Sequence, residues 1–260
     1  MKKTLLSLST TLALAALPQL VLAQAAAPAA PAAEPAAAEA SPLSFNVGLT
    51  NDYRYRGISQ SRLEFAGSAG IDYALPAGFY VGAWISSIKW IKDLGGNSNA
   101  EVDLYGGYKG EISKDLTYDV GVLTYYYHNN DLSPTANTTE IYGAMTFGPA
   151  TLKYSHALSN LFGFANSKNS NYLDLTATFE VGPAVQLIPH IGFQRVAGNS
   201  DFSYMDYSFT VGKDFSGFFL SAAIVGADTH DINGVKAYTS PNNGKDLGRA
   251  GFLVGVKKTF

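Results

Sequence analysis

Segments in which apolar and polar residues alternate with a period of two are the feature that most limits how this chain can fold. In YLDLTATFEV, residues 172–181, apolar side chains occupy the odd positions, and tyrosine or polar side chains occupy the even ones. This pattern predicts a β-strand with one apolar and one polar face. Its length of ten residues suits a tilted strand that crosses a membrane.

The same alternation recurs and predicts twelve strands. They span residues 44–57, 62–74, 78–89, 100–110, 116–127, 138–148, 150–158, 171–181, 185–195, 202–213, 217–227 and 248–260. The connections alternate between tight turns, such as LPAG and GPAV, and longer loops, such as the segment from Asp228 to Leu247. Short turns on one side and long loops on the other are typical of an up-and-down, antiparallel transmembrane β-barrel. A secreted β-sandwich is the alternative all-β fold.

Composition agrees with a barrel. The chain has no cysteine, 26 glycines and 16 tyrosines, and only 15% of its residues are charged. An exported protein without disulfides needs a large core or a membrane for its stability. Outside the first residues, no apolar run is long enough for a transmembrane helix. The net charge of −3 gives no basic field, so we expect no nucleic-acid partner.

The N-terminal residues predict export. Lys2 and Lys3 precede a short apolar run, and small residues before Gln24 indicate cleavage near Ala23. Residues 1–23 are therefore predicted to be a signal peptide. Residues 24–42 are mostly Ala and Pro and predict a disordered linker, because the prolines interrupt any helix. The barrel is predicted over residues 43–260.

In a membrane barrel the apolar face meets lipid and the polar face lines the lumen. Counting by twos places nearly all strand charges inward, as expected, because a cation facing lipid at mid-membrane costs about 2–4 kcal/mol. The predicted pore-lining residues are Asp52, Arg54, Arg56, Glu64, Asp72, Glu101, Asp103, Asp119, Asp174, Glu180, Asp206 and Arg249, and the same count places Lys109, Glu140, Lys153, Lys213 and Lys257 inward. These charges either pair across a narrow lumen or line a path for solutes, and the two readings overlap.

The stretch NDYRYRGISQS, residues 51–61, is predicted to complete the first strand and form the first outer turn. Tyr53 and Tyr55 would then face the outer lipid interface, as part of an aromatic girdle. Arg54 and Arg56 would form a positive ladder on the lumen wall. Either carboxylates such as Glu64 pair with this ladder, or the ladder favours anionic solutes at the pore entrance.

Other kinds of site find little support. The four histidines are scattered without metal-ligand spacing, so no metal or cofactor is predicted. Ser155 and His156 are adjacent, but neighbours on a strand point to opposite faces. We therefore predict that the protein is not an enzyme. The abundant tyrosines could alternatively form a carbohydrate-stacking track.

Several stretches carry a family resemblance: NDYRYRGISQS, DYALPAGFYVGAWISS, EVDLYGGYKG and YDVGVLTYYY. With the signal peptide, they resemble the TorF-family porins of bacteria. That resemblance implies an outer-membrane channel but supplies no substrate and no site residues. We expect passive diffusion of small hydrophilic solutes; a structural or adhesive barrel with a closed lumen is the alternative. The expected partners are outer-membrane lipid and the barrel-assembly machinery, which would read the last strand ending at Phe260.

Overall fold

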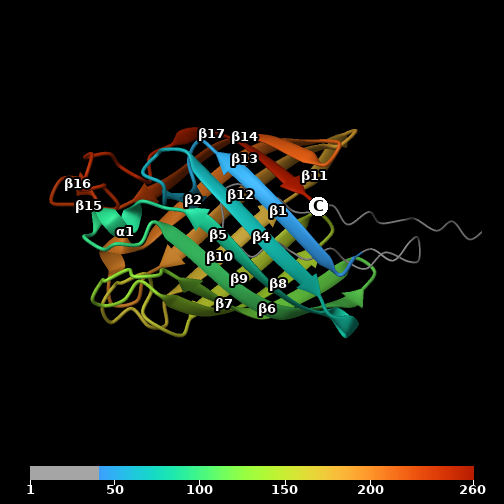
Figure 1. Cartoon of the computed structure of the whole chain (residues 1–260), viewed down its shortest axis with the longest axis horizontal. Coiled ribbons are helices and arrows are strands. Elements are labelled where there is room, and N and C mark those ends of the chain that lie inside the picture. Colours follow the sequence, from blue (N-terminus) through green and yellow to red (C-terminus); the bar gives the residue numbers. More distant parts are fainter. Residues whose placement is uncertain (1–40) are drawn as a thin grey trace, which may run out of the picture.

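The computed structural model describes residues 41–260, which form a closed antiparallel β-barrel (Figure 1). In chain order, the wall consists of β1 (Leu43–Thr50), β4 (Ala66–Ala74), β5 (Phe79–Ser87), β6 (Ala100–Ser113), β7 (Leu116–Tyr126), β8 (Thr138–Phe147), β9 (Ala150–Ala157), β10 (Asn171–Ala177), β11 (Phe179–Gly182), β12 (Val185–Arg195), β13 (Tyr204–Phe215), β14 (Phe218–Thr229) and β17 (Gly251–Thr259). Apart from β10 and β11, each wall strand pairs with the next wall strand in sequence, and β1 closes the barrel by pairing with both β4 and β17.

The wall has twelve crossings, because β10 and β11 are two parts of one strand that both pair with β12. The break lies at Thr178, directly opposite the part of β12 that contains Pro189. Proline has no backbone N–H to donate to a neighbouring strand, which accounts for the gap in pairing at this point. The predicted fold class and strand number are therefore confirmed, and Pro189 interrupts the ladder without ending its strand.

The two ends of the barrel differ, as the alternation of short and long connections predicted. At one end the strands are joined by tight turns, one of which contains the 3₁₀ helix η1 (Pro76–Gly78). The longer loops at the other end hold α1 (Trp90–Asp93), η2 (Ser200–Phe202) and the small hairpin of β15 (Asp231–Ile232) and β16 (Val235–Lys236). Figure 1 shows α1, β15 and β16 at the opposite end from the C-terminus.

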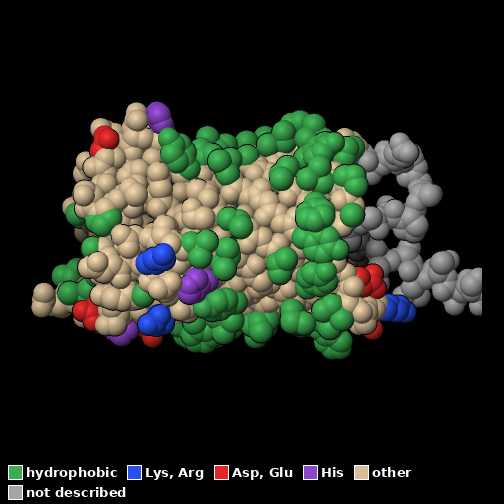
Figure 2. Space-filling model, turned by 90° about the horizontal axis from the view of Figure 1, so that it is seen from below, with side chains coloured by type: hydrophobic (Ala, Val, Ile, Leu, Met, Phe, Trp, Pro, Cys, Tyr) green, Lys and Arg blue, Asp and Glu red, His purple; other side chains and the backbone are tan. Residues whose placement is uncertain are grey.

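The outer surface of the wall is apolar. Exposed side chains alternate with buried ones along the strands, as at Leu173, Leu175 and Phe209. In Figure 2 hydrophobic side chains gather on the wall, most densely near one end, and charged side chains lie toward its two ends. No helix among residues 41–260 combines the length and apolar character needed to cross a membrane. The predicted signal peptide and residues 24–40 of the predicted linker lie outside the described residues.

Candidate functional site: the polar lumen

The first strand is shorter than predicted, because the chain leaves the wall after Thr50 and folds into the barrel. At the point of departure the Asn51 side chain adds two hydrogen bonds to β17 beside the bond from its own backbone N–H to the Val254 carbonyl oxygen. Its amide donates to the Phe252 carbonyl oxygen (3.1 Å) and accepts from the Val254 N–H (2.9 Å). The next residues form a small hairpin of β2 (Arg54–Tyr55) and β3 (Ile58–Ser59). We call residues 51–65 the inward segment.

Most of the inward segment is packed inside the lumen and does not form an outer turn. Every residue from 52 to 61 is buried. Its tight turn places Arg56 and Gly57 at positive φ, 46° and 78°. The predicted outer turn at ISQS is therefore wrong. Ile58 and Ser59 form the second strand of the hairpin and pair with Tyr55 and Arg54. The Ser59 N–H also donates to the Leu247 carbonyl oxygen across the lumen mouth, at 3.0 Å.

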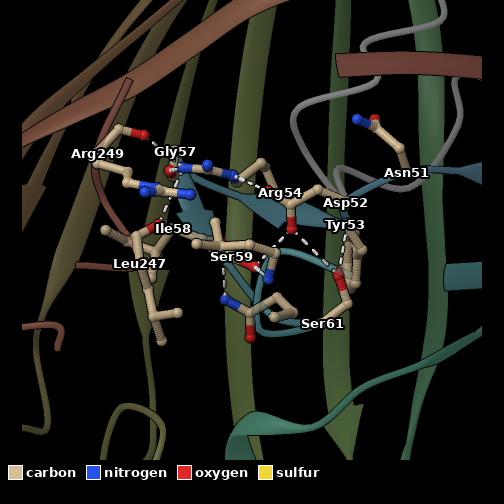
Figure 3. A network of polar contacts seen from close by, with 12 residues as sticks. Asn51, Asp52, Tyr53, Arg54, Gly57, Ile58, Ser59, Ser61, Leu247 and Arg249 are labelled. Carbon is tan, nitrogen blue, oxygen red and sulfur yellow. Dashed lines mark hydrogen bonds and ion pairs between the residues drawn. The ribbon is translucent and has the colours of Figure 1, made fainter. Parts of the chain in front are cut away.

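Arg54 fastens the inward segment to itself and to the last outer loop (Figure 3). Its Nε donates to the Asp52 carboxylate at 2.5 Å, and its Nη1 donates to the carbonyl oxygens of Gly57 and Leu247, both at 2.9 Å. The other Asp52 oxygen accepts from the hydroxyl of Ser59. The Arg54 side chain is only 1% exposed. The hydrogen bonds of this guanidinium therefore go to the protein itself, and its burial keeps it from contacting a passing solute.

Arg56 crosses the lumen to the opposite wall. Its two terminal nitrogens bind the Glu140 carboxylate of β8 at 3.1 and 2.7 Å, and Nη1 also donates to Gln194 of β12 at 2.7 Å. Its guanidinium lies 4.3 Å from the ring centre of Tyr172. Bidentate pairing fixes the arginine in orientation as well as position. Arg54 and Arg56 thus pair with separate carboxylates and do not form the predicted ladder.

A small cavity lies beside Arg56. Its volume is about 20 Å³, enough for one water molecule. It is lined by Tyr55, Arg56, Tyr125, Lys153, Ser155, Tyr172 and Asp174. Because its walls carry charges and hydroxyl groups, this cavity suits water or a small ion.

The tyrosines of the inward segment face the lumen interior, which contradicts the predicted lipid-facing girdle positions. The Tyr53 hydroxyl donates to Glu101 of β6, and its ring packs edge-on against Trp84. The Tyr55 hydroxyl donates to the Tyr125 hydroxyl at 2.8 Å. Both tyrosines are buried because the segment that carries them has left the wall.

A second buried network lies on the facing wall. His190 of β12 lies between two carboxylates, with Nε2 at 2.9 Å from Asp206 and Nδ1 at 3.3 Å from Asp174. The Tyr172 hydroxyl donates to Asp206 at 2.9 Å, and the Thr176 hydroxyl donates to Asp174 at 2.9 Å. Alternation along the strands predicted the acidic residues on the inward face and allowed His190 there as a polar lining residue, but it did not indicate that His190 would contact two carboxylates.

The half of the lumen near the tight turns is polar but less densely packed. The Asp72 carboxylate accepts from the Tyr105 hydroxyl, and Asp119 accepts from the Tyr80 hydroxyl at 2.6 Å. Lys109 lies 3.8 Å from Asp119. Near the end of the barrel, exposed Glu180 accepts a hydrogen bond from Gln186 at 2.8 Å.

Three residues lie elsewhere than predicted. Glu64 is exposed and pairs with Lys89, so it does not neutralise either arginine. Arg249 precedes β17 with an exposed side chain, and only its carbonyl oxygen contacts Arg54, at 3.2 Å. Lys213 lies on the exposed face of β13, which carries the odd-numbered residues, and its ammonium is 4.9 Å from the Phe215 ring centre. Lys213 is tolerated there because it lies near the strand end, where a long side chain can reach water.

Comparison with known proteins identifies the family and the fold. Residues 33–260 match the family described as "Bacterial protein of unknown function (Gcw_chp)". The chain belongs to the Gcw_chp family. No protein with curated annotation has a sequence that matches it. The TorF-family resemblance remains a prediction.

Solved structures similar to this Gcw_chp protein include porins. The KdgM porin is 7% identical with a TM-score of 0.54, and the match covers 84% of this chain and 98% of KdgM. A KdgM porin in complex with disordered oligogalacturonate matches over the same shares with a TM-score of 0.53 at 7% identity. The NanC porin is 11% identical with a TM-score of 0.52, covering 83% of this chain and 98% of NanC. At these identities the similarity establishes the barrel fold alone.

Proposed function

We propose that this protein is an outer-membrane channel through which small hydrophilic solutes diffuse passively. One observation carries the proposal: the inward face is polar and ionisable at successive depths, from Glu101 at the loop end through Lys153 to Asp72 near the tight turns. Buried charges stabilise a folded chain little compared with apolar side chains of the same size. A closed core would gain little from such a lining, whereas a solute path needs it.

The inward segment limits what such a channel can pass. Its residues 52–61 are buried inside the lumen, and the cavity beside Arg56 has room for about one water molecule, so the proposed solutes are ions and small polar molecules. The resemblance to TorF-family porins supports the same function. In this proposal residues 1–23 direct export with cleavage near Ala23, and the strand ending at Phe260 is read by the barrel-assembly machinery in the outer membrane.

Planar-bilayer recording tests the channel. Protein without residues 1–23, refolded in detergent and checked for heat-modifiable migration, should give discrete conductance steps. The steps should be small, because a twelve-stranded barrel with an internal constriction is narrower than the large porins. Folded protein that inserts into the bilayer but never conducts would refute the channel.

A second function is favoured by the burial of residues 52–61: a closed barrel that acts through its outer loops. Deleting residues 231–245 separates the two functions. This deletion keeps Leu247, whose carbonyl oxygen holds Arg54, so the inward segment retains its anchor. A closed, adhesive barrel should not conduct before or after the deletion and should lose its surface binding, whereas the channel should conduct equally well in both forms.

A further inference from the structure

Negative charge is in excess in the outer half of the lumen, the half nearer the long loops. Six inward carboxylates face this region, on Asp52, Glu101, Asp103, Glu140, Asp174 and Asp206. The cations there are Arg54, Arg56 and, at mid-depth, Lys153, which lies opposite Asp174 in the pairing of β9 with β10. With all six carboxylates ionised and His190 protonated, six negative charges face four positive ones, so two negative charges are unbalanced.

The imbalance is concentrated on β6. Glu101 accepts hydrogen bonds from the hydroxyls of Tyr53 and Tyr127, which satisfy both of its oxygens but bring no positive charge to it. Asp103 follows two residues later on the same face, about 6.5 Å along the strand. Across residues 41–260 the structure gives Asp103 no ion pair, and its Oδ1 is buried without a hydrogen-bond partner. The residue is only 2% exposed.

A buried carboxylate without a partner takes up a proton, and it is ionised only when a positive group comes close to it. The surroundings of Asp103 suit such a partner, because it faces Trp84 on β5 and Tyr125 on β7 in the strand pairing. Aromatic rings attract cations through their faces. No group of three metal-ligating side chains converges anywhere in the described part of the chain, so the geometry favours a mobile cation over a fixed metal ion.

We propose that the lumen selects small cations over anions, and that Asp103 is the residue that sets this preference. This inference rests on the proposed channel function. It reverses the anion preference that an unpaired arginine ladder would give, because Asp52 and Glu140 neutralise Arg54 and Arg56. A monovalent cation passing the constriction takes the place of the missing partner of Asp103, while an anion meets an excess of like charge.

Reversal potentials in a KCl gradient test the proposal in the same bilayer assay. The unaltered protein should favour K⁺ over Cl⁻. Asp103→Asn should lower the K⁺/Cl⁻ permeability ratio by about two- to fivefold, since it removes one negative charge from a narrow, poorly screened site. Asp103→Glu should retain the preference. Asp115→Asn is the matched control, because Asp115 is exposed in a tight turn outside the lumen.

The outcomes separate the two proposals. Conductance with a preference for Cl⁻, or a permeability ratio unchanged by Asp103→Asn, would overturn the cation selectivity and leave the channel intact. Absence of conductance from correctly folded protein would overturn the channel itself and the selectivity with it. Heat-modifiable migration of each variant establishes that a changed ratio comes from a folded barrel.

Discussion

At the scale of single residues, the buried pair of Arg56 and Glu140 makes the sharpest stability prediction. Both side chains are at most 4% exposed, and the pair is bidentate. Glu140→Gln would leave the Arg56 guanidinium buried without a counter-charge. We expect the free energy of unfolding to fall by about 3–5 kcal/mol, the usual cost of removing one partner of a buried ion pair. Urea unfolding in lipid vesicles, followed by tryptophan fluorescence, measures this loss.

Glu64→Gln is the control for that measurement, because it removes the same charge from an exposed pair with Lys89. Exposed pairs contribute at most about 1 kcal/mol. The hydrogen bond from Lys89 lowers the pKa of Glu64, so this small contribution is present at neutral pH and disappears as the pH falls through the lowered pKa. Equal losses in the two variants would mean that the Arg56–Glu140 pair is not buried in the folded protein.

Alternation in the sequence predicts on which side of the wall a strand residue lies, because successive side chains in a strand point to opposite faces. It places Glu101, Asp103 and Glu140 on one side, and the structure has them on the inward face. Alternation says nothing about partners. The contact between Arg56 and Glu140 joins residues 84 positions apart, and only the closed barrel brings them together.

At the scale of elements, the inward segment is the part of the fold that the sequence could not predict. Charged residues and tyrosines alternate through residues 52–56 with the same period of two as in a wall strand. What turns the chain inward is a set of distant contacts, including the Asn51 amide on β17 and Arg54 on Leu247. The twelve wall strands were predictable because each repeats the alternation over its own length and is bounded by turn residues.

Gly57 makes the position of the inward segment testable. Its φ of +78° is unfavourable for other residues, and an added Cβ would lie 2.6 Å from the Asp206 Cβ and 3.0 Å from the Gly226 carbonyl oxygen. Gly57→Ala should therefore displace the hairpin from the wall and raise the single-channel conductance. Gly234→Ala has a similar φ of +82° but open space around it, so it isolates backbone strain. Identical conductance in the two variants would show that the hairpin does not restrict the path.

At the scale of the whole molecule, the barrel has an apolar belt that faces lipid and a polar interior. This arrangement predicts that the cost of placing a charge on the outer surface depends on its depth in the membrane. Phe209 lies near the middle of β13 and is 48% exposed, whereas Phe147 ends β8 beside a tight turn and is 67% exposed. Phe209→Arg should lower the free energy of unfolding in lipid vesicles by about 2–4 kcal/mol, and Phe147→Arg by at most about 1 kcal/mol, because a terminal arginine can reach water. A soluble β-sandwich has no such gradient. Equal effects at the two positions would therefore contradict a membrane-spanning barrel, whatever its lumen conducts.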